Sequence, residues 1–143
     1  MIRIASFNIE NLFVRSLMNS LEAGAHVVVL GDLNEGPAVA GSQAPHLAAL
    51  FENNSPLIDC YSLPGFDLGN RPGTFDSCGM RNRLDYIFIS RNLQPYYTSG
   101  RVFRKGLWGS RVARPTLWET YPEITASKEG ASDHSAVVIE LNI

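Results

Sequence analysis

The chain has 143 residues, of which 45% are hydrophobic, so it can bury one core of ordinary size and we expect residues 1–143 to form a single domain. A formal net charge of -2 at pH 7 excludes a protein that attracts nucleic acid by overall positive charge, although a local basic surface stays compatible with it. Its 2 cysteines, Cys60 and Cys78, exclude a disulfide scaffold and are expected to be free thiols.

The amino terminus predicts no targeting segment. It begins directly in a strand-like pattern and lacks the basic and apolar segments of a secretory signal. No apolar run approaches the length that is needed to span a membrane. We therefore expect a cytoplasmic protein that does not associate with a membrane.

The first part of the sequence predicts a β-α-β opening. Residues 1–8 alternate apolar and polar positions, which predicts a strand that ends near Asn8. Apolar side chains recur at nearly helical spacing over residues 11–23, and Gly24 follows as a typical C-cap, so we expect a helix there. The apolar, β-branched residues 27–30 then predict a buried strand that ends in Gly-Asp-Leu-Asn.

The rest of the sequence contains many turn signals, with clusters of Gly and Pro between short apolar segments. Its predicted elements are a short helix at 44–51, a brief apolar segment at 57–61, and strands at 74–76, 84–90, 101–104 and 136–141.

Two polar residues follow the predicted strand at 27–30. Because strand side chains alternate between faces, Asp32 and Asn34 would point the same way, one an anionic acceptor and the other an amide. Such a pair suits a phosphate centre at the end of a strand, where α/β sheets usually carry their chemistry. The alternative is that Asp-Leu-Asn-Glu-Gly-Pro is simply the turn that ends the strand.

Later segments add further polar residues in unusual positions. Asp85 lies inside an apolar strand, where an ionisable group is costly unless it is paired, so we expect it to have a specific partner. Asp133 and His134 immediately precede the final strand, and their alternative interpretation is a polar turn. A carboxylate bonded to one nitrogen of His134 would fix its tautomer and raise its basicity.

Four short motifs in this order carry a resemblance to a known family. They are Phe-Asn-Ile-Glu-Asn-Leu at 7–12, Gly-Asp-Leu-Asn at 31–34, Arg-Leu-Asp-Tyr-Ile at 83–87 and Ser-Asp-His-Ser at 132–135. The ordered set resembles the endonuclease/exonuclease/phosphatase superfamily, which includes pancreatic-type deoxyribonucleases, abasic-site endonucleases, inositol-phosphate phosphatases and neutral sphingomyelinases. The resemblance implies an α/β fold, a β-sandwich of two sheets flanked by helices, with a Mg²⁺-dependent phosphoester hydrolase site at the strand ends.

The resemblance implies a catalytic role for four residues. Asp32 would orient or deprotonate the attacking water, and Asn34 would bind a phosphate oxygen or help to position that water. His134 would contact the scissile phosphate and would be held by Asp85. The chemistry is consistent with these roles, because a general base and a hard cation with oxygen ligands are what an anionic phosphoester needs.

The resemblance also implies metal ligands, and here the sequence departs from the family pattern. Asn8 would lie at the metal or its water shell and Asp133 would face the metal, which we expect to be Mg²⁺ or else Mn²⁺. Family members carry a further Glu ligand in a long segment that here runs only from residue 9 to residue 25. The candidates are Glu10 and Glu22 in this segment and His26 directly after it, none in a matching context, and Glu10 is the nearest to Asn8.

The short segment indicates an internal deletion near residues 15–16. Roughly half of the usual sandwich is then absent, and the remaining sheet should expose an apolar face or edge. A homo-oligomer that covers this surface is therefore expected.

Candidate substrate-binding residues come mainly from a basic stretch late in the chain. Arg and Lys residues between 101 and 114 alternate with aromatic ones, as in grooves that bind nucleic acid by charge and stacking. A solvated loop anchored by two tryptophans is an equal alternative. The candidates are Arg71, Arg83, Arg104, Lys105, Trp108 and Arg111.

These observations predict a Mg²⁺-dependent phosphodiester hydrolase of nuclease type, in which water attacks phosphorus. Its partner would be nucleic acid or another phosphodiester substrate. A catalytically inactive, truncated module that binds nucleic acid or phosphoesters is one alternative. A phosphatase or phospholipid head-group hydrolase is another, because the shared chemistry does not select the alcohol on phosphorus.

Overall fold

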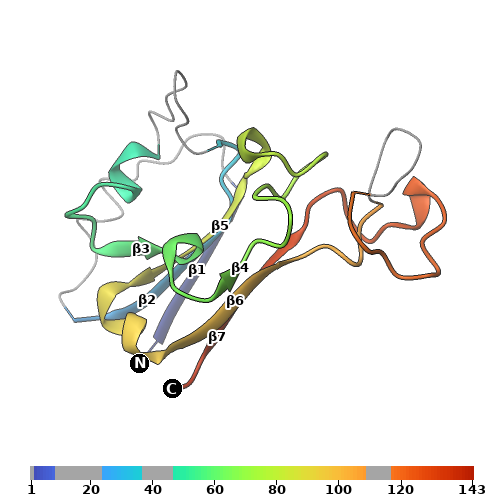
Figure 1. The fold of residues 1–143 in the computed structure, drawn as a ribbon. Coiled ribbons are helices and arrows are strands. Elements are labelled where there is room, and N and C mark those ends of the chain that lie inside the picture. Colours follow the sequence, from blue (N-terminus) through green and yellow to red (C-terminus); the bar gives the residue numbers. More distant parts are fainter. Residues whose placement is uncertain (1, 9–23, 37–46, 109–116) are drawn as a thin grey trace.

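The computed structural model describes residues 2–8, 24–36, 47–108 and 117–143. Within these ranges the chain forms short strands in two sheets, connected by loops and short 3-10 helices (Figure 1). The strands are β1 (Ile2–Asn8), β2 (His26–Asp32), β3 (Leu57–Asp59), β4 (Phe66–Asp67), β5 (Asp85–Ser90), β6 (Tyr97–Phe103) and β7 (Ala136–Leu141). The 3-10 helices are η1 (Ala48–Leu50), η2 (Cys60–Ser62), η3 (Met80–Asn82), η4 (Arg91–Tyr96) and η5 (Ser127–Glu129).

The first sheet places three polar positions in one row. Its strand order is β1-β2-β5-β3, with β1 parallel to β2 and the other neighbours antiparallel. In this register Asn8 pairs with Asp32, and Asp32 pairs with Asp85. The carboxyl ends of β1 and β2 therefore meet the amino end of β5, although Asp85 lies 53 positions after Asp32 in the numbering.

The second sheet, β4-β6-β7, packs against the first. Val28, Ile87 and Ile89 of the first sheet form one apolar cluster together with Val137 and Ile139 of β7. Apolar side chains on facing sheets are withdrawn from water together, which is the main force that holds a sandwich closed. This packing brings the start of β7 to the edge where β2 ends and β5 begins.

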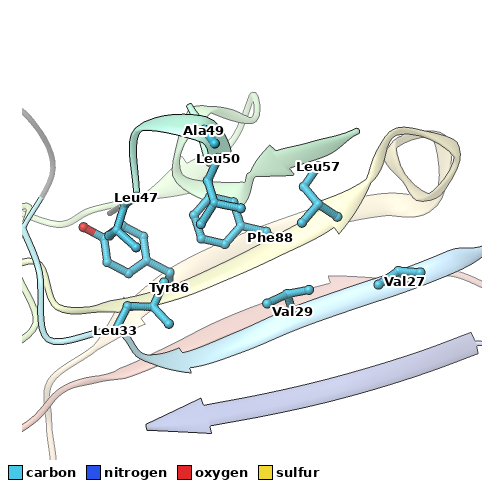
Figure 2. Packing of buried hydrophobic residues seen from close by; sticks show 9 residues of the cluster. All are labelled: Val27, Val29, Leu33, Leu47, Ala49, Leu50, Leu57, Tyr86 and Phe88. Atoms are coloured by element: carbon cyan, nitrogen blue, oxygen red, sulfur yellow. The ribbon is translucent and has the colours of Figure 1, made fainter. Parts of the chain in front are cut away.

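The other face of the first sheet is also covered, as Figure 2 shows. Val27 and Val29 of β2 and Phe88 of β5 lie under Leu50 of η1 and Leu57 of β3. Because successive strand residues face opposite sides, a strand buried on both faces is apolar at consecutive positions. This explains the unbroken apolar run at the start of β2.

The predicted strands at 1–8, 27–30, 84–90 and 136–141 are confirmed as β1, β2, β5 and β7. The strand predicted at 101–104 is part of the longer β6. Its extension was missed because it contains Gly100, which in the structure lies under the Phe66 ring, where a Cβ atom would come within 2.5 Å of that ring. The free thiols are confirmed, and burial raises the pKa of Cys60 to about 12.

Three predicted segments differ from the structure. The described part of the expected helix at 44–51 contains only the three-residue turn η1. This turn is enough to bury the side chains of Ala49 and Leu50 in the cluster that covers β2 and β5. The segment at 57–61 divides into β3 and part of η2, and 74–76 forms only an isolated bridge from Phe75 to His134. The helix predicted at 11–23 lies outside the described residues, which begin again at Gly24, the expected C-cap.

None of the described helices is long and apolar enough to cross a lipid bilayer. β1 is the edge strand of the first sheet, and Ile4 on it is 71% exposed.

Candidate active site

Three side chains from distant segments meet at the edge of the first sheet. Asp32 is the last residue of β2, Asp85 is the first residue of β5, and His134 lies two residues before β7. One ligand atom from each of them lies within 4.8 Å of the other two. Each side chain is half-buried, so the group is positioned by the protein and still reached by solvent.

Asp85 and His134 form a specific pair, which confirms that the carboxylate in the apolar strand has a partner. Nδ1 of His134 lies 2.8 Å from the carboxylate of Asp85. With Nδ1 donating to the carboxylate, the imidazole has a fixed orientation and its other nitrogen, Nε2, is left for a substrate or a proton.

The segment at 74–75 holds both members of this pair in place. The hydroxyl of Thr74 accepts hydrogen bonds from the backbone N–H groups of Leu84 and Asp85, at 3.1 and 3.2 Å. The carbonyl of Thr74 accepts one from the N–H of Ser135 at 2.7 Å, and the ring of Phe75 lies 4.8 Å from that of His134. Sequence analysis did not identify Thr74, because a lone Thr before a turn carries no distinguishing pattern.

Asp32 and Asn34 are arranged as a turn rather than as a continued strand. β2 ends at Asp32, whose carboxylate accepts a hydrogen bond of 2.9 Å from the backbone N–H of Asn34. Asn34 has a φ of 53°, a left-handed conformation that Asn tolerates better than most residues. The expectation that both side chains share a strand face is therefore wrong, because the strand ends at Asp32 and Asn34 lies in the turn that follows.

The donor set at this site fits a divalent cation. Two carboxylates supply the oxygen ligands that a hard cation prefers, and a nearby imidazole is compatible with Mn²⁺ as well. Asn8 lies beside Asp32 in register, which places its backbone at the same edge. Asp133 is exposed and is outside the group of three within the described residues, while Glu10 is not among the residues described.

The predicted substrate-binding residue Arg83 is buried in the fold. Its guanidinium group forms an ion pair with Asp59 and lies 3.7 Å from the ring centre of Tyr61 and 4.5 Å from that of Tyr86. Burial raises the pKa of Asp59 above its ordinary value although Arg83 acts in the opposite direction. The guanidinium of Arg83 is thus committed to the protein interior, and its expected contact with substrate has no support in this geometry.

The other predicted basic residues are also bonded within the protein. Arg104 is 6% exposed and donates to the carbonyls of Leu68, Arg71 and Gly73. Lys105 pairs with Glu119 at 2.8 Å on the surface. The guanidinium of Arg71 donates a hydrogen bond to the carbonyl of Ser77. The predicted aromatic residue Trp108 lines a pocket, and Arg111 lies outside the described residues. Arg83 and Arg104 are therefore buried in bonds with the protein, whereas substrate contacts by Arg71, Lys105, Trp108 and Arg111 stay predictions.

The sandwich thus carries two carboxylates and a histidine at its strand ends, an arrangement that suits a divalent cation and a phosphate group. The chain belongs to the Endonuclease/Exonuclease/phosphatase family, because the model of that family matches residues 7–134. The resemblance carried by the four sequence motifs is thereby confirmed.

Solved structures share the fold of this chain. A mannosyl-6-phosphatase of Bacteroides thetaiotaomicron VPI-5482 matches with a TM-score of 0.58 and 22% identity over 91% of this chain and 43% of its own. An endonuclease/exonuclease/phosphatase family protein from Bacteroides thetaiotaomicron matches with a TM-score of 0.56 and 23% identity over 90% of this chain and 42% of its own. The chain spans less than half the length of either structure, which confirms the truncated α/β fold. No curated protein matches the sequence.

Proposed function

We propose that this chain is a metal-dependent phosphoric-ester hydrolase in which water attacks phosphorus at the site formed by Asp32, Asp85 and His134. The observation that carries the proposal is the convergence of these three side chains, in a family whose members hydrolyse phosphoric esters. Structural cores rarely gather two carboxylates and an imidazole at a half-exposed edge, because each desolvated charge costs free energy.

Each residue has a role that follows from its position. Asp32 accepts a proton from the attacking water or orients it, because its carboxylate is fixed by the turn to Asn34. His134 presents Nε2 to an oxygen of the phosphoryl group, because its Nδ1 is engaged by Asp85. Asn34 follows Asp32 at the same strand end and is proposed to bind a phosphate oxygen.

The site residues would hold Mg²⁺, with Mn²⁺ as the alternative. Carboxylate oxygens of Asp32 and Asp85 are the candidate ligands among the described side chains, and Asn8 and Asp133 are proposed as further ones. A bound divalent cation supplies positive charge that neutralises the oxygens on phosphorus. Glu10 stays a prediction.

A small phosphoester is the substrate that the geometry favours over a nucleic acid. Binding of a nucleic acid backbone depends on several cations that contact successive phosphates. Arg83 and Arg104 are instead buried in bonds with the protein, and Lys105 has an acidic partner. A solved structure of similar fold is named as a mannosyl-6-phosphatase, which also supports phosphatase activity for this chain. We therefore place phosphatase activity ahead of nuclease activity.

Hydrolysis of simple esters tests this proposal. Purified protein would be incubated with 4-nitrophenyl phosphate, bis(4-nitrophenyl) phosphate and plasmid DNA, each with Mg²⁺, with Mn²⁺ and with chelator. We expect metal-dependent release of product that falls by about 10²–10⁴-fold in Asp32→Asn, Asp85→Asn and His134→Gln. Glu123→Gln, which changes an exposed carboxylate elsewhere, is the matched control. Absence of turnover on every ester, or full turnover in Asp32→Asn, would contradict the proposal.

A binding module without catalysis is the second candidate. It is favoured by one observation, that the chain spans only 43% of a neighbour that is named as an enzyme. This alternative predicts salt-sensitive binding of nucleic acid or of a phosphoester that survives Asp32→Ala and is not followed by turnover. Equilibrium binding at two salt concentrations distinguishes the two candidates.

A further inference from the structure

A pocket of about 850 Å³ opens beside His134. Phe75 connects the two, because its ring lies 4.8 Å from the imidazole and also lines the pocket. Asp133, the residue before His134, lines the pocket as well. Pockets for small organic ligands occupy about 300–1,000 Å³, so this space is larger than a phosphate group alone requires. It is positioned to receive what is attached to the phosphate.

The walls of the pocket are held by backbone hydrogen bonds. The N–H of Ala131 donates to the carbonyl of Gly106 at 2.9 Å, which joins the segment before Trp108 to the segment before Asp133. At Gly130 a Cβ atom would lie 3.2 Å from the backbone nitrogen of Trp108, so the two walls are in close contact. A cavity that exists before the ligand arrives costs little ordering on binding.

The lining combines aromatic surface with hydroxyl and carboxylate groups. Trp108 and Phe75 supply flat apolar faces, and Trp108 is only half-buried. Ser127, Ser132 and the carboxylate of Asp133 supply hydrogen-bonding groups. A sugar ring needs this combination, because its C–H faces pack on aromatic rings while its hydroxyl groups form hydrogen bonds around its edge.

Charge argues against a nucleic acid strand in the same pocket. The pocket lining includes the carboxylates of Asp76 and Asp133, and among the described residues its basic side chain is Lys128. A second phosphate in this space would face carboxylates, whereas a neutral sugar would not be repelled.

We propose that this pocket binds the leaving group of the substrate and that the leaving group is a sugar, so that the substrate is a sugar phosphate. This inference rests on the proposed hydrolase function of the neighbouring site. The oxygen of water forms a bond to phosphorus while the bond from phosphorus to the sugar oxygen breaks. The sugar oxygen takes up a proton, and the products are the free sugar and inorganic phosphate.

The first test compares substrates in matched variants. Release of phosphate would be followed from a hexose 6-phosphate, from methyl phosphate, which has no ring, and from adenosine 5′-monophosphate. We expect Trp108→Ala to lower kcat/KM for the hexose 6-phosphate at least about tenfold more than for methyl phosphate, because stacking is lost. Trp108→Phe should restore part of this loss, and Tyr121→Ala, an exposed aromatic outside the pocket, should leave both values unchanged. Equal losses on the two substrates, or a preference for the nucleotide over the hexose phosphate, would overturn the proposal.

The second test measures binding without turnover, so that failure of the hydrolase proposal is distinguishable from failure of this one. Addition of a hexose 6-phosphate should change the tryptophan fluorescence, because Trp108 lines the pocket, whereas Trp118 is buried in a cluster with Leu107 and Leu117 and is not part of the lining. The change should disappear in Trp108→Phe. A protein that hydrolyses no ester but shows this change disproves only the hydrolase function, whereas no change at millimolar sugar phosphate overturns the pocket assignment.

Discussion

Removal of the Arg83 guanidinium should strongly destabilise the fold. The side chains of Arg83 and Asp59 are only 9% and 11% exposed, and the guanidinium lies against the rings of Tyr61 and Tyr86. Arg83→Met keeps an unbranched apolar stem but leaves the carboxylate of Asp59 buried without its counter-charge. Loss of one partner of a buried ion pair costs about 3–5 kcal/mol.

Urea denaturation followed by circular dichroism measures this effect. With a dependence of about 2 kcal/mol per molar urea for a domain of this size, the midpoint should fall by about 2 M. The double variant Arg83→Met with Asp59→Asn should lose less than the sum of the single variants, because neither charge is then left unpaired. Lys105→Met removes the exposed partner of Glu119 and should change the midpoint little. A loss in Arg83→Met no larger than in this control would refute the reasoning.

Three further predictions follow from backbone packing, titration and the sheet edge. Gly73→Ala should lower the free energy of unfolding by more than about 2 kcal/mol, because its Cβ atom would lie 2.2 Å from the carbonyl oxygen of Gly79, whereas Gly79→Ala has open space and should be tolerated. Burial raises the pKa of the Asp59 carboxyl group above its ordinary value of 3.8, so the folded state binds the carboxyl proton more tightly than the unfolded state does. The free energy of unfolding should therefore fall as the pH rises from 3.8 through the pKa of the folded state, and Asp59→Asn should flatten this pH dependence in urea titrations. Ile4→Lys on the exposed edge strand should reduce self-association in sedimentation experiments, and a wild-type monomer at all concentrations would disprove the expected homo-oligomer.

The sequence predicted the strands that carry the site because their patterns are local. β2 and β5 are apolar over consecutive positions and end or begin at a carboxylate, so Asp32 and Asp85 could be identified without a structure. That Asp85 has a partner followed from the cost of a buried charge, whereas the resemblance to the family named His134 as that partner, and the two are hydrogen-bonded in the structure. β6 was only partly found, because a glycine that lies under Phe66 looks like a strand breaker in the sequence.

The fate of the arginines could not be predicted, because burial depends on contacts between distant segments. Arg83 is surrounded by Asp59 and Tyr61, more than twenty positions earlier in the numbering, and no local pattern distinguishes it from an exposed basic residue. Arg104 donates to carbonyls of the loop at 68–73, which a sequence pattern cannot place. Both residues were assigned to substrate binding from their charge and their neighbours in the sequence, and neither indicates whether a guanidinium faces solvent or carbonyl oxygens.

The register of two neighbouring strands explains how so short a chain can retain a site. Asp32 and Asp85 are direct partners across β2 and β5, so their separation is fixed by the hydrogen bonds of one antiparallel pair. A shift of that register by one residue would turn Asp85 to the other face of the sheet, and would at the same time exchange Ile87 and Ile89 with Tyr86 and Phe88 between the two packed faces. The apolar cores on the two faces therefore maintain the spacing of the carboxylates. His134 is added by its bridge to Phe75, and its imidazole then meets the carboxylate of Asp85.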